Sequence, residues 1–342
     1  MKIKDLGSEF KLLDKIKSLS KKINNNFISQ IGDDCAIIDK TKEAGKYELK
    51  RNCKTSKTGN GKYELITTDI LVEDNHFSMK FSTSFQIGAK AIECNVSDIA
   101  SCGGLPRYCV ISLVLPKDTT VKFLEGLYKG MNDACRKYNI DIVGGDTTSG
   151  AIIVINIAMF GEVEKDMLCR RSDAKVGDLI LVTGCLGRSC SGLNLFLQGK
   201  EKLGETKYYL EPVARLNKAR EIAKYVNAMI DISDGLASET RHICIMSDCG
   251  AVIYKDKIPI DKQTIKDAKT CGKDPYDYAL SGGEDYELLF TLSKNDYNKH
   301  KHLFKDCFVV GEIVEKEKGI KLAEIINGKE VKKELGKGYE HF

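Results

Sequence analysis

The sequence predicts a mixed α/β (α+β) protein built from two domains. Its 342 residues exceed the usual size of one domain. With 42% hydrophobic and 30% charged residues, the composition is typical of a folded chain. Strand-like and helix-like patterns alternate along the whole length, without the fixed period of a solenoid or propeller. We expect an N-terminal domain over residues 1–160 and a C-terminal domain over 161–342.

The N-terminal domain is expected to begin with an amphipathic helix over residues 8–24, where apolar residues recur at helical spacing. The segment 40–63 is rich in Lys and Arg and poor in large apolar residues, which favours an exposed loop or hairpin. Further patterns predict strands over 63–72, 108–115, 140–143 and 152–160, and helices over 85–102 and 118–138.

The C-terminal domain repeats this style from about residue 176. Strands are expected over 179–183, 229–232, 251–254, 287–292 and 307–314. Helices are expected over 189–199, 214–226, 235–247 and 294–305. This half therefore also reads as an α/β domain.

Charge and hydropathy argue against several kinds of binding partner. Lys and Arg number 53 and Asp and Glu 49, and the resulting net charge of +4 is too small to indicate nucleic-acid or membrane-surface binding. No apolar run approaches the length of a membrane span, and the first residues do not resemble a signal peptide. We expect a cytoplasmic protein that binds neither nucleic acid nor membrane.

Cysteine is abundant, with 13 residues, but no two are spaced as C-x-x-C. That spacing is typical of zinc ribbons and thioredoxin-type sites, so its absence argues against both. An odd number also argues against a secreted disulfide framework. We expect most of the thiols to be small buried apolar groups in a reducing compartment.

Aspartates gather where the predicted strands and helices end, beside Gly, Ser or Thr. They are Asp33, Asp34, Asp69, Asp98, Asp146, Asp231 and Asp234. Any one of them is explained by a turn or a helix cap, but apolar strands leading into so many favour a shared site. Carboxylates brought together without Lys or Arg repel one another unless cations bind, and hard oxygen ligands suit Mg²⁺. The residues therefore suggest phosphate chemistry.

The common phosphate-binding motifs are absent. The chain has no G-x-x-x-x-G-K-[ST], and it lacks the glycine-rich loop, H-R-D and D-F-G motifs of protein kinases. The segment 184–192 joins a strand to a helix, and it is compatible with either an anion-binding loop or a plain tight turn.

Seven segments together resemble one known family, the thiamine-monophosphate kinases of the aminoimidazole ribonucleotide synthetase superfamily. The resemblance runs in order from about residue 8 to the last residue. Its segments are Gly32-Asp33-Asp34-Cys35-Ala36, Thr67-Thr68-Asp69 with His76-Phe77, Asn95-Val96-Ser97-Asp98, Gly144-Gly145-Asp146-Thr147-Thr148, Asp231-Ile232-Ser233-Asp234-Gly235-Leu236, Ser281-Gly282-Gly283-Glu284-Asp285-Tyr286-Glu287-Leu288 and Lys337-Gly338-Tyr339-Glu340-His341-Phe342.

The resemblance implies the two-domain fold of that superfamily, with the N-terminal sheets paired across a homodimer, and ATP-dependent phosphorylation of thiamine monophosphate to thiamine diphosphate. It implies that several Mg²⁺ ions are held by Asp33, Thr67, Thr68, Asp69, Asp98, Asp146, Asp231 and Asp234. It places ATP against Tyr128, Gly145, Asp146, Arg171 and Ser233, and the thiamine substrate against His76 and Glu284. Within these sets, Asp98, Asp146 and Asp231 are expected to be catalytic.

Some assignments stay open at this stage. Arg170 rivals Arg171 as the ATP contact, and His76 is compatible with either packing or substrate binding. Glu284 is favoured over Asp285 on the substrate side. The chain also departs from the family by having Gly336 where an aromatic residue is common, and by the length of its basic segment 40–63.

The chemistry of two phosphates explains why such a site needs cations. The acceptor phosphate has a second pKa near 6, so it is largely ionised at pH 7 and needs no general base. We expect direct in-line transfer without a phosphoenzyme, assisted by carboxylate-bound Mg²⁺. The alternatives are another ATP-using enzyme of the superfamily, which activates an amide or selenide, and a non-catalytic nucleotide-binding homologue.

Overall fold

The computed structural model describes residues 33–39, 61–326 and 328–339, together with Lys11, Lys15, Ile16 and Ser18. Most of the predicted helix over 8–24 and most of the basic segment 40–63 therefore lie outside the described residues. None of the helices in the described ranges is long and apolar enough to span a bilayer.

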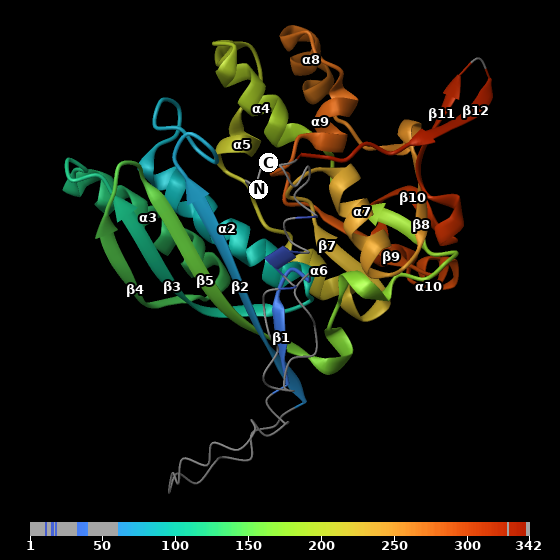
Figure 1. Cartoon of the computed structure of the whole chain (residues 1–342), viewed down its shortest axis with the longest axis horizontal. Helices are drawn as coiled ribbons and strands as arrows, with labels where there is room; N and C mark the ends of the chain where they lie inside the picture. The colour runs from blue at the N-terminus through green and yellow to red at the C-terminus, as the bar shows by residue number, and fades with distance from the viewer. Residues whose placement is uncertain are drawn as a thin grey trace, which may run out of the picture.

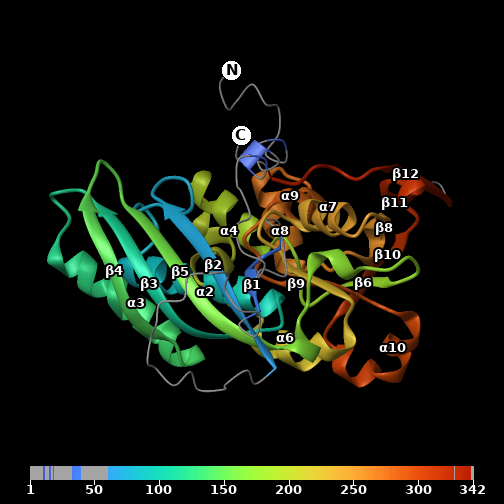
Figure 2. The same cartoon turned by 60° about the horizontal axis from the view of Figure 1, so that its bottom comes forward.

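Five strands form the first sheet, in the order β1-β2-β5-β3-β4 (Figure 1). Their bounds are β1 Ala36–Ile38, β2 Lys62–Val72, β3 Leu105–Leu115, β4 Asp141–Ser149 and β5 Val154–Glu164. Only β3 and β4 pair in parallel. Side chains alternate along β2, so Thr67 and Leu71 are buried while Thr68 and Ile70 are exposed. In the described part of the chain, helices cover one face of this sheet and leave the other open (Figure 2).

The helix α2 (Ser84–Ser101) is the central element of the molecule. A capping box starts it: Gln86 N donates to Thr83 Oγ1 at 3.3 Å, and Thr83 N donates to Gln86 Oε1 at 3.0 Å. It packs against β2 and β5 on one side and against the second domain on the other, and α3 (Val121–Tyr138) lies along it. The C-terminal half of α2, which carries Asp98, is therefore held between the two domains.

Seven strands form the second sheet, in the order β12-β11-β8-β10-β6-β9-β7. Their bounds are β6 Leu179–Val182, β7 Ala228–Asp231, β8 Gly250–Tyr254, β9 Leu288–Leu292, β10 Phe308–Val314, β11 Ile320–Ile326 and β12 Lys329–Glu334. Only β8 and β11 run in parallel. The hairpin of β11 and β12 projects from the body of the domain (Figure 1).

The second sheet has helices on both faces, and further helices lie beyond them. The helices of this part of the chain are α4 Arg188–Leu197, α5 Lys207–Leu210, α6 Leu216–Ile222, α7 Leu236–Met246, α8 Lys262–Cys271, α9 Pro275–Ser281 and α10 Lys294–Lys299. On one face, α7 and α9 bury Leu236, Ile243 and Ala279 against the strands. On the other face, Met229 and Phe290 join the core that α2 and α6 share with the first sheet. One continuous core thus connects the domains.

The strand and helix predictions agree with the structure in most places and differ in a few. The strand predicted over 140–143 extends to Ser149, so Asp146 lies inside β4 and the strand end expected before it is wrong. The helix predicted over 214–226 ends at Ile222 and continues as a 3₁₀ turn, as does the one over 294–305 after Lys299. The sequence did not predict β1, β11, β12, α5, α8 or α9. The division of the chain at residue 160 stays a prediction.

Candidate active site

Three carboxylates from distant parts of the chain meet at the boundary between the domains. Asp34 precedes β1, Asp98 lies on α2 and Asp231 ends β7. One oxygen from each lies within 4.8 Å of the others. The sequence analysis expected Asp98 and Asp231 to share a cation site, and the structure brings their carboxylates together with that of Asp34, where Asp33 had been expected. That these residues hold a cation stays a prediction.

Asp98 is half-buried and lies among like charges. Burial raises its pKa well above the ordinary value, and the nearby carboxylates of Asp69, Asp231 and Asp34 raise it further. Thr67 Oγ1 donates a hydrogen bond to Asp98 Oδ2, which opposes the rise. Since Thr67 sits on the buried face of β2, this bond fixes the carboxylate against the first sheet.

Asp231 is also affected by burial and by neighbouring negative charges. Burial, followed by the charge of Asp34, raises its pKa to about 8. Ser97 Oγ donates to Asp231 Oδ2 at 2.6 Å, and the positive charge of Arg171 also favours the ionised form. Ser97 and Asp98 are neighbours on α2, so one turn of this helix orients one carboxylate and supplies another.

Asp34 is the member of the cluster with a cationic partner. Arg171 Nη2 forms an ion pair with Asp34 Oδ1, and Ser101 Oγ donates to Asp34 Oδ2 at 2.6 Å. The backbone N–H of Arg171 donates to Asp33 Oδ1 at 3.0 Å, while burial raises the Asp33 pKa. Arg170 instead pairs with Asp173. Of the two rival arginines, Arg171 is therefore the one at the cluster.

Asp69 lies beside the cluster on β2. Burial, followed by the charges of Asp34 and Asp234, raises its pKa to about 6. Its neighbour Thr68 points to the opposite face of the sheet, where Asn156 Nδ2 donates to Thr68 Oγ1 at 2.9 Å. Among the three residues of the Thr67-Thr68-Asp69 motif, the side chains of Thr67 and Asp69 thus face the cluster and that of Thr68 does not.

The cluster fits divalent cations. Its donors are carboxylate and hydroxyl oxygens, which hard ions such as Mg²⁺ prefer. Arg171 pairs with one of the carboxylates, and the pKa values of Asp98 and Asp231 are raised first by burial and then by the repulsion of neighbouring carboxylates. Bound cations would relieve that repulsion.

Glu239, which the sequence motifs did not single out, stabilises the loop after β7. Its Oε1 accepts from the backbone N–H of Ser233 at 3.0 Å and of Asp234 at 2.7 Å. Glu239 is buried at the start of α7, and the Ser233 side chain is exposed. Glutamate inside the first helical turn is a known signal for such capping, so the missed residue was recognisable in principle.

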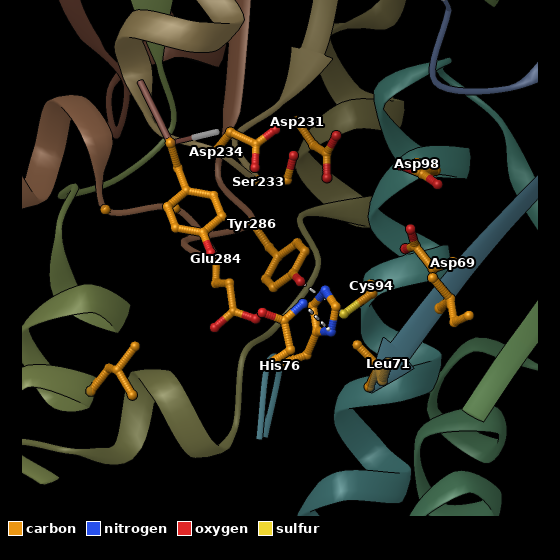
Figure 3. A pocket seen from close by; sticks show the side chains of 16 residues that line it. Asp69, Leu71, His76, Cys94, Asp98, Asp231, Ser233, Asp234, Glu284 and Tyr286 are labelled. Carbon is orange, nitrogen blue, oxygen red and sulfur yellow. Dashed lines mark hydrogen bonds between the residues drawn. The ribbon is translucent and has the colours of Figure 1, made fainter. Parts of the chain in front are cut away.

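A cavity of about 290 Å³ opens beside the cluster. Figure 3 shows Asp69, Asp98 and Asp231 on one side of it and His76 with Glu284 at the other end. Its lining is polar and acidic near the cluster and mixed elsewhere, and comprises Asp69, Ile70, Leu71, Asn75, His76, Cys94, Asp98, Leu193, Asp231, Ser233, Asp234, Gly282, Gly283, Glu284, Tyr286 and Tyr339. The cavity therefore joins a cation site to a space suited to an organic ligand.

The loop 282–287 reaches the cavity by packing on the loop after β7. Gly283 has φ +68°, and a Cβ there would lie 2.4 Å from the carbonyl oxygen of Ser233. Glu284 also has a positive φ, and its N–H donates to the same carbonyl at 2.7 Å. This close contact directs the Glu284 side chain into the cavity.

Asp285 turns the other way and has a structural partner. Its two oxygens accept from Gly187 N at 2.6 Å and Ser189 N at 3.2 Å, at the start of α4. Burial raises the Asp285 pKa to about 7. The segment 184–192 therefore has its helix N-terminus occupied by a carboxylate of the same chain, which supports the plain-turn interpretation of that segment.

Besides Thr68, three predicted site residues lie away from the cavity. Tyr128 is half-buried on α3, and Gly145 and Asp146 are exposed on β4. Asp146 pairs with Ser112, Ser112 with Asn156, and Asn156 with Ile70, so about 14 Å of sheet separates Asp146 from the cavity wall. A single copy of the chain does not bring these three residues to the cluster, and their roles stay predictions.

Both halves of the chain match models of the AIR synthase related proteins, the N-terminal domain model over residues 32–163 and the C-terminal domain model over 175–322. The chain is 36% identical to thiamine-monophosphate kinase of Aquifex aeolicus over 100% of both sequences. It is 34% identical to that of Bacillus subtilis, covering 82% of this chain and 89% of the relative.

Solved structures also resemble this chain. The structure described as AaThiL complexed with AMPPCP and TMP superposes with a TM-score of 0.81 at 36% identity, covering 100% of this chain and 99% of the other. Hydrogenase maturation protein HypE, at 19% identity and a TM-score of 0.67, shares the fold.

Proposed function

The chain belongs to the thiamine-monophosphate kinase family, and from that premise we propose that it transfers the γ-phosphoryl group of ATP to thiamine monophosphate, giving ADP and thiamine diphosphate. The observation that carries this proposal is the meeting of Asp34, Asp98 and Asp231 beside the cavity. The related structure's AMPPCP, an ATP analogue, and TMP support the choice of donor and acceptor.

Charge repulsion is the obstacle that this site has to overcome. Two unit charges ~4 Å apart at an effective dielectric constant of about 20 repel by about 4 kcal/mol, and an ionised acceptor phosphate meeting ATP multiplies that cost. Mg²⁺, when bound, supplies the positive charge that lets the two phosphates approach. Asp34, Asp98 and Asp231 would hold such ions, with Asp69, Asp234 and the predicted Asp33 close by.

The chain's own groups fix the direction of the ligating oxygens. Ser97, Ser101 and Thr67 each donate a hydrogen bond to one carboxylate of the cluster. Their bonds hold the carboxylates in place before any ligand arrives, so little reorganisation is needed when the reactants bind. The family resemblance places Arg171 against ATP. Its ion pair with Asp34 limits the net negative charge that the nucleotide meets.

The far end of the cavity would take the organic part of the acceptor. Glu284 presents a carboxylate there, and thiamine monophosphate has a cationic thiazolium ring and an aminopyrimidine that suit it. His76 is less free to turn, since Val72 N donates to its Nδ1 at 3.1 Å. We assign Glu284 the main contact and His76 a place in the cavity wall.

We propose that transfer is direct, with the acceptor phosphate in line with the γ-phosphoryl group. The acceptor is already a nucleophile at pH 7, so a phosphoenzyme adds nothing to the reaction. Inversion of configuration at a chiral γ-phosphate is the expected result, and retention would require a covalent intermediate.

We further propose that the molecule acts as a homodimer through the open face of the first sheet. Ile70 and Tyr108 are exposed on this face, 51% and 40% respectively, and Asp146 lies on it as well. No described helix covers this face, and an exposed apolar sheet face is typical of an interface. Tyr108→Lys is expected to shift the mass measured by light scattering from dimer to monomer, and a wild-type monomer would refute the proposal.

One assay tests the function against its alternatives. Purified protein is mixed with ATP, Mg²⁺ and thiamine monophosphate, and ADP and thiamine diphosphate are measured together. Equal amounts of both products are expected, with none from unphosphorylated thiamine or in excess chelator. ADP without thiamine diphosphate would indicate another ATP-using enzyme of the superfamily, and the absence of ADP would indicate a non-catalytic homologue.

A further inference from the structure

A buried ammonium group forms part of the wall behind Glu284. Lys90 lies on α2, on the N-terminal side of the cavity, and only 3% of its side chain is exposed. Its Nζ is 2.8 Å from Glu284 Oε1, a residue of the C-terminal domain. Among the described residues, no other cation pairs with Glu284.

Two more contacts complete the surroundings of this ammonium group. Lys90 Nζ donates to the carbonyl oxygen of His76 at 3.0 Å, and it lies 4.5 Å from the centre of the Tyr209 ring. Tyr209 Oη donates to the same carbonyl at 3.4 Å. Lys90 therefore joins the loop after β2, the loop 282–287 and α5 at one point of the cavity wall.

The buried Lys90 ammonium group is stable only because it has several partners. An ammonium group loses its hydration on burial, and a well-placed anion, carbonyl group and aromatic face offset that loss. Removing the ammonium would leave Glu284 without its partner, in a cavity that already contains Asp69 and Asp234. The Glu284 side chain, 22% exposed, would then turn toward solvent.

We propose that Lys90 is a positioning residue for the acceptor: it occupies Glu284 Oε1 and thereby holds Oε2 as a fixed acceptor for the thiamine moiety. This inference rests on the proposed function and adds to it a residue that the family motifs do not mark. Because Lys90 acts through Glu284, its effect is confined to the acceptor and does not extend to ATP.

The test compares Lys90→Met with a control, Lys137→Met, whose side chain is more exposed. Lys137 has similar partners away from the cavity, since its Nζ lies 2.9 Å from the buried Glu93 and 4.5 Å from the Tyr138 ring. We expect Lys90→Met to raise the KM for thiamine monophosphate about tenfold or more and to change the KM for ATP less than about twofold. Lys137→Met should leave both constants unchanged.

The double variant separates positioning from general destabilisation. In a Glu284→Gln background, Lys90→Met should raise the acceptor KM by less than about twofold, because the group through which Lys90 acts is already altered. Additive effects, an unchanged acceptor KM or tighter acceptor binding in Lys90→Met would each overturn the inference. If wild-type protein makes no thiamine diphosphate, the proposed function fails instead. Calorimetric titration of thiamine monophosphate gives a second readout that does not depend on turnover.

Discussion

Replacing Asp231 by Asn is expected to abolish the reaction and, in the absence of metal ions, to stabilise the fold. The side chains have nearly the same shape, and Ser97 can donate to the amide oxygen as it does to the carboxylate. What changes is one buried negative charge within 4.8 Å of two other carboxylates.

The expected change in the free energy of unfolding follows from the distance between the carboxylates. At 4.8 Å and an effective dielectric constant of about 20, one pair of like charges repels by about 3.5 kcal/mol. The rise of the Asp231 pKa to about 8 corresponds to about 5–6 kcal/mol, because it also includes desolvation, its first cause. We therefore expect Asp231→Asn to gain about 3 kcal/mol in free energy of unfolding at pH 8, and roughly 5 °C or more in Tm.

The raised pKa of Asp231 also determines whether stability rises or falls with pH. Between pH 4 and pH 8 folded wild-type protein retains the Asp231 proton that the unfolded chain loses, so wild-type stability falls as the pH increases. Asn does not titrate. The advantage of Asp231→Asn should therefore be small near pH 4, grow toward pH 8 and stay level above it.

Thermal unfolding in chelator and in Mg²⁺ provides the assay. Mg²⁺ should raise the Tm of wild-type protein much more than that of Asp231→Asn, reversing or narrowing the difference seen in chelator. If the variant is less stable than wild type in chelator at pH 8, Asp231 serves the fold and the repulsion argument is wrong. An equal response of both proteins to Mg²⁺ would remove Asp231 from the cation site.

Three other predictions follow from the contacts. Asp98→Asn should lower kcat by about a thousandfold or more with an unchanged circular dichroism spectrum, and near-normal turnover would exclude Asp98 from the site. Ser97→Ala should raise the Mg²⁺ concentration for half-maximal rate, since Asp231 loses the bond that orients it; an unchanged value would show that this bond is dispensable. Asp285→Ala should lower the free energy of unfolding by about 1–2 kcal/mol in denaturant titrations, because two N–H groups at α4 lose their acceptor, and a loss of activity at full stability would contradict that structural role.

The sequence allowed the main elements to be predicted where local signals agree with tertiary structure. Helix α2 was predicted to within one residue at each end, because its apolar spacing and the glycines after it are both local signals. β4 was predicted too short, since glycines weaken the strand pattern after Val143, whereas pairing with β3 keeps the chain extended to Ser149. Such pairing is invisible in a local window.

The site was predictable as a set of motifs but not as a geometry. Aspartates at strand and helix ends indicated a cation site, yet the choice between Asp33 and Asp34 depends on where Arg171 lies. Lys90 carried no signal at all, because its partner Glu284 is in the other domain. Contacts between distant segments arise only from the packing of the two domains around α2.

Anomalous diffraction from crystals containing Mn²⁺, AMPPCP and thiamine monophosphate tests the central claim most directly, because it locates cations and both reactants at once. We predict metal peaks touching oxygens of Asp34, Asp98 and Asp231, with phosphates of both ligands bound to the same ions. Both ligands seated in the cavity with no metal between those carboxylates and the phosphates would contradict it.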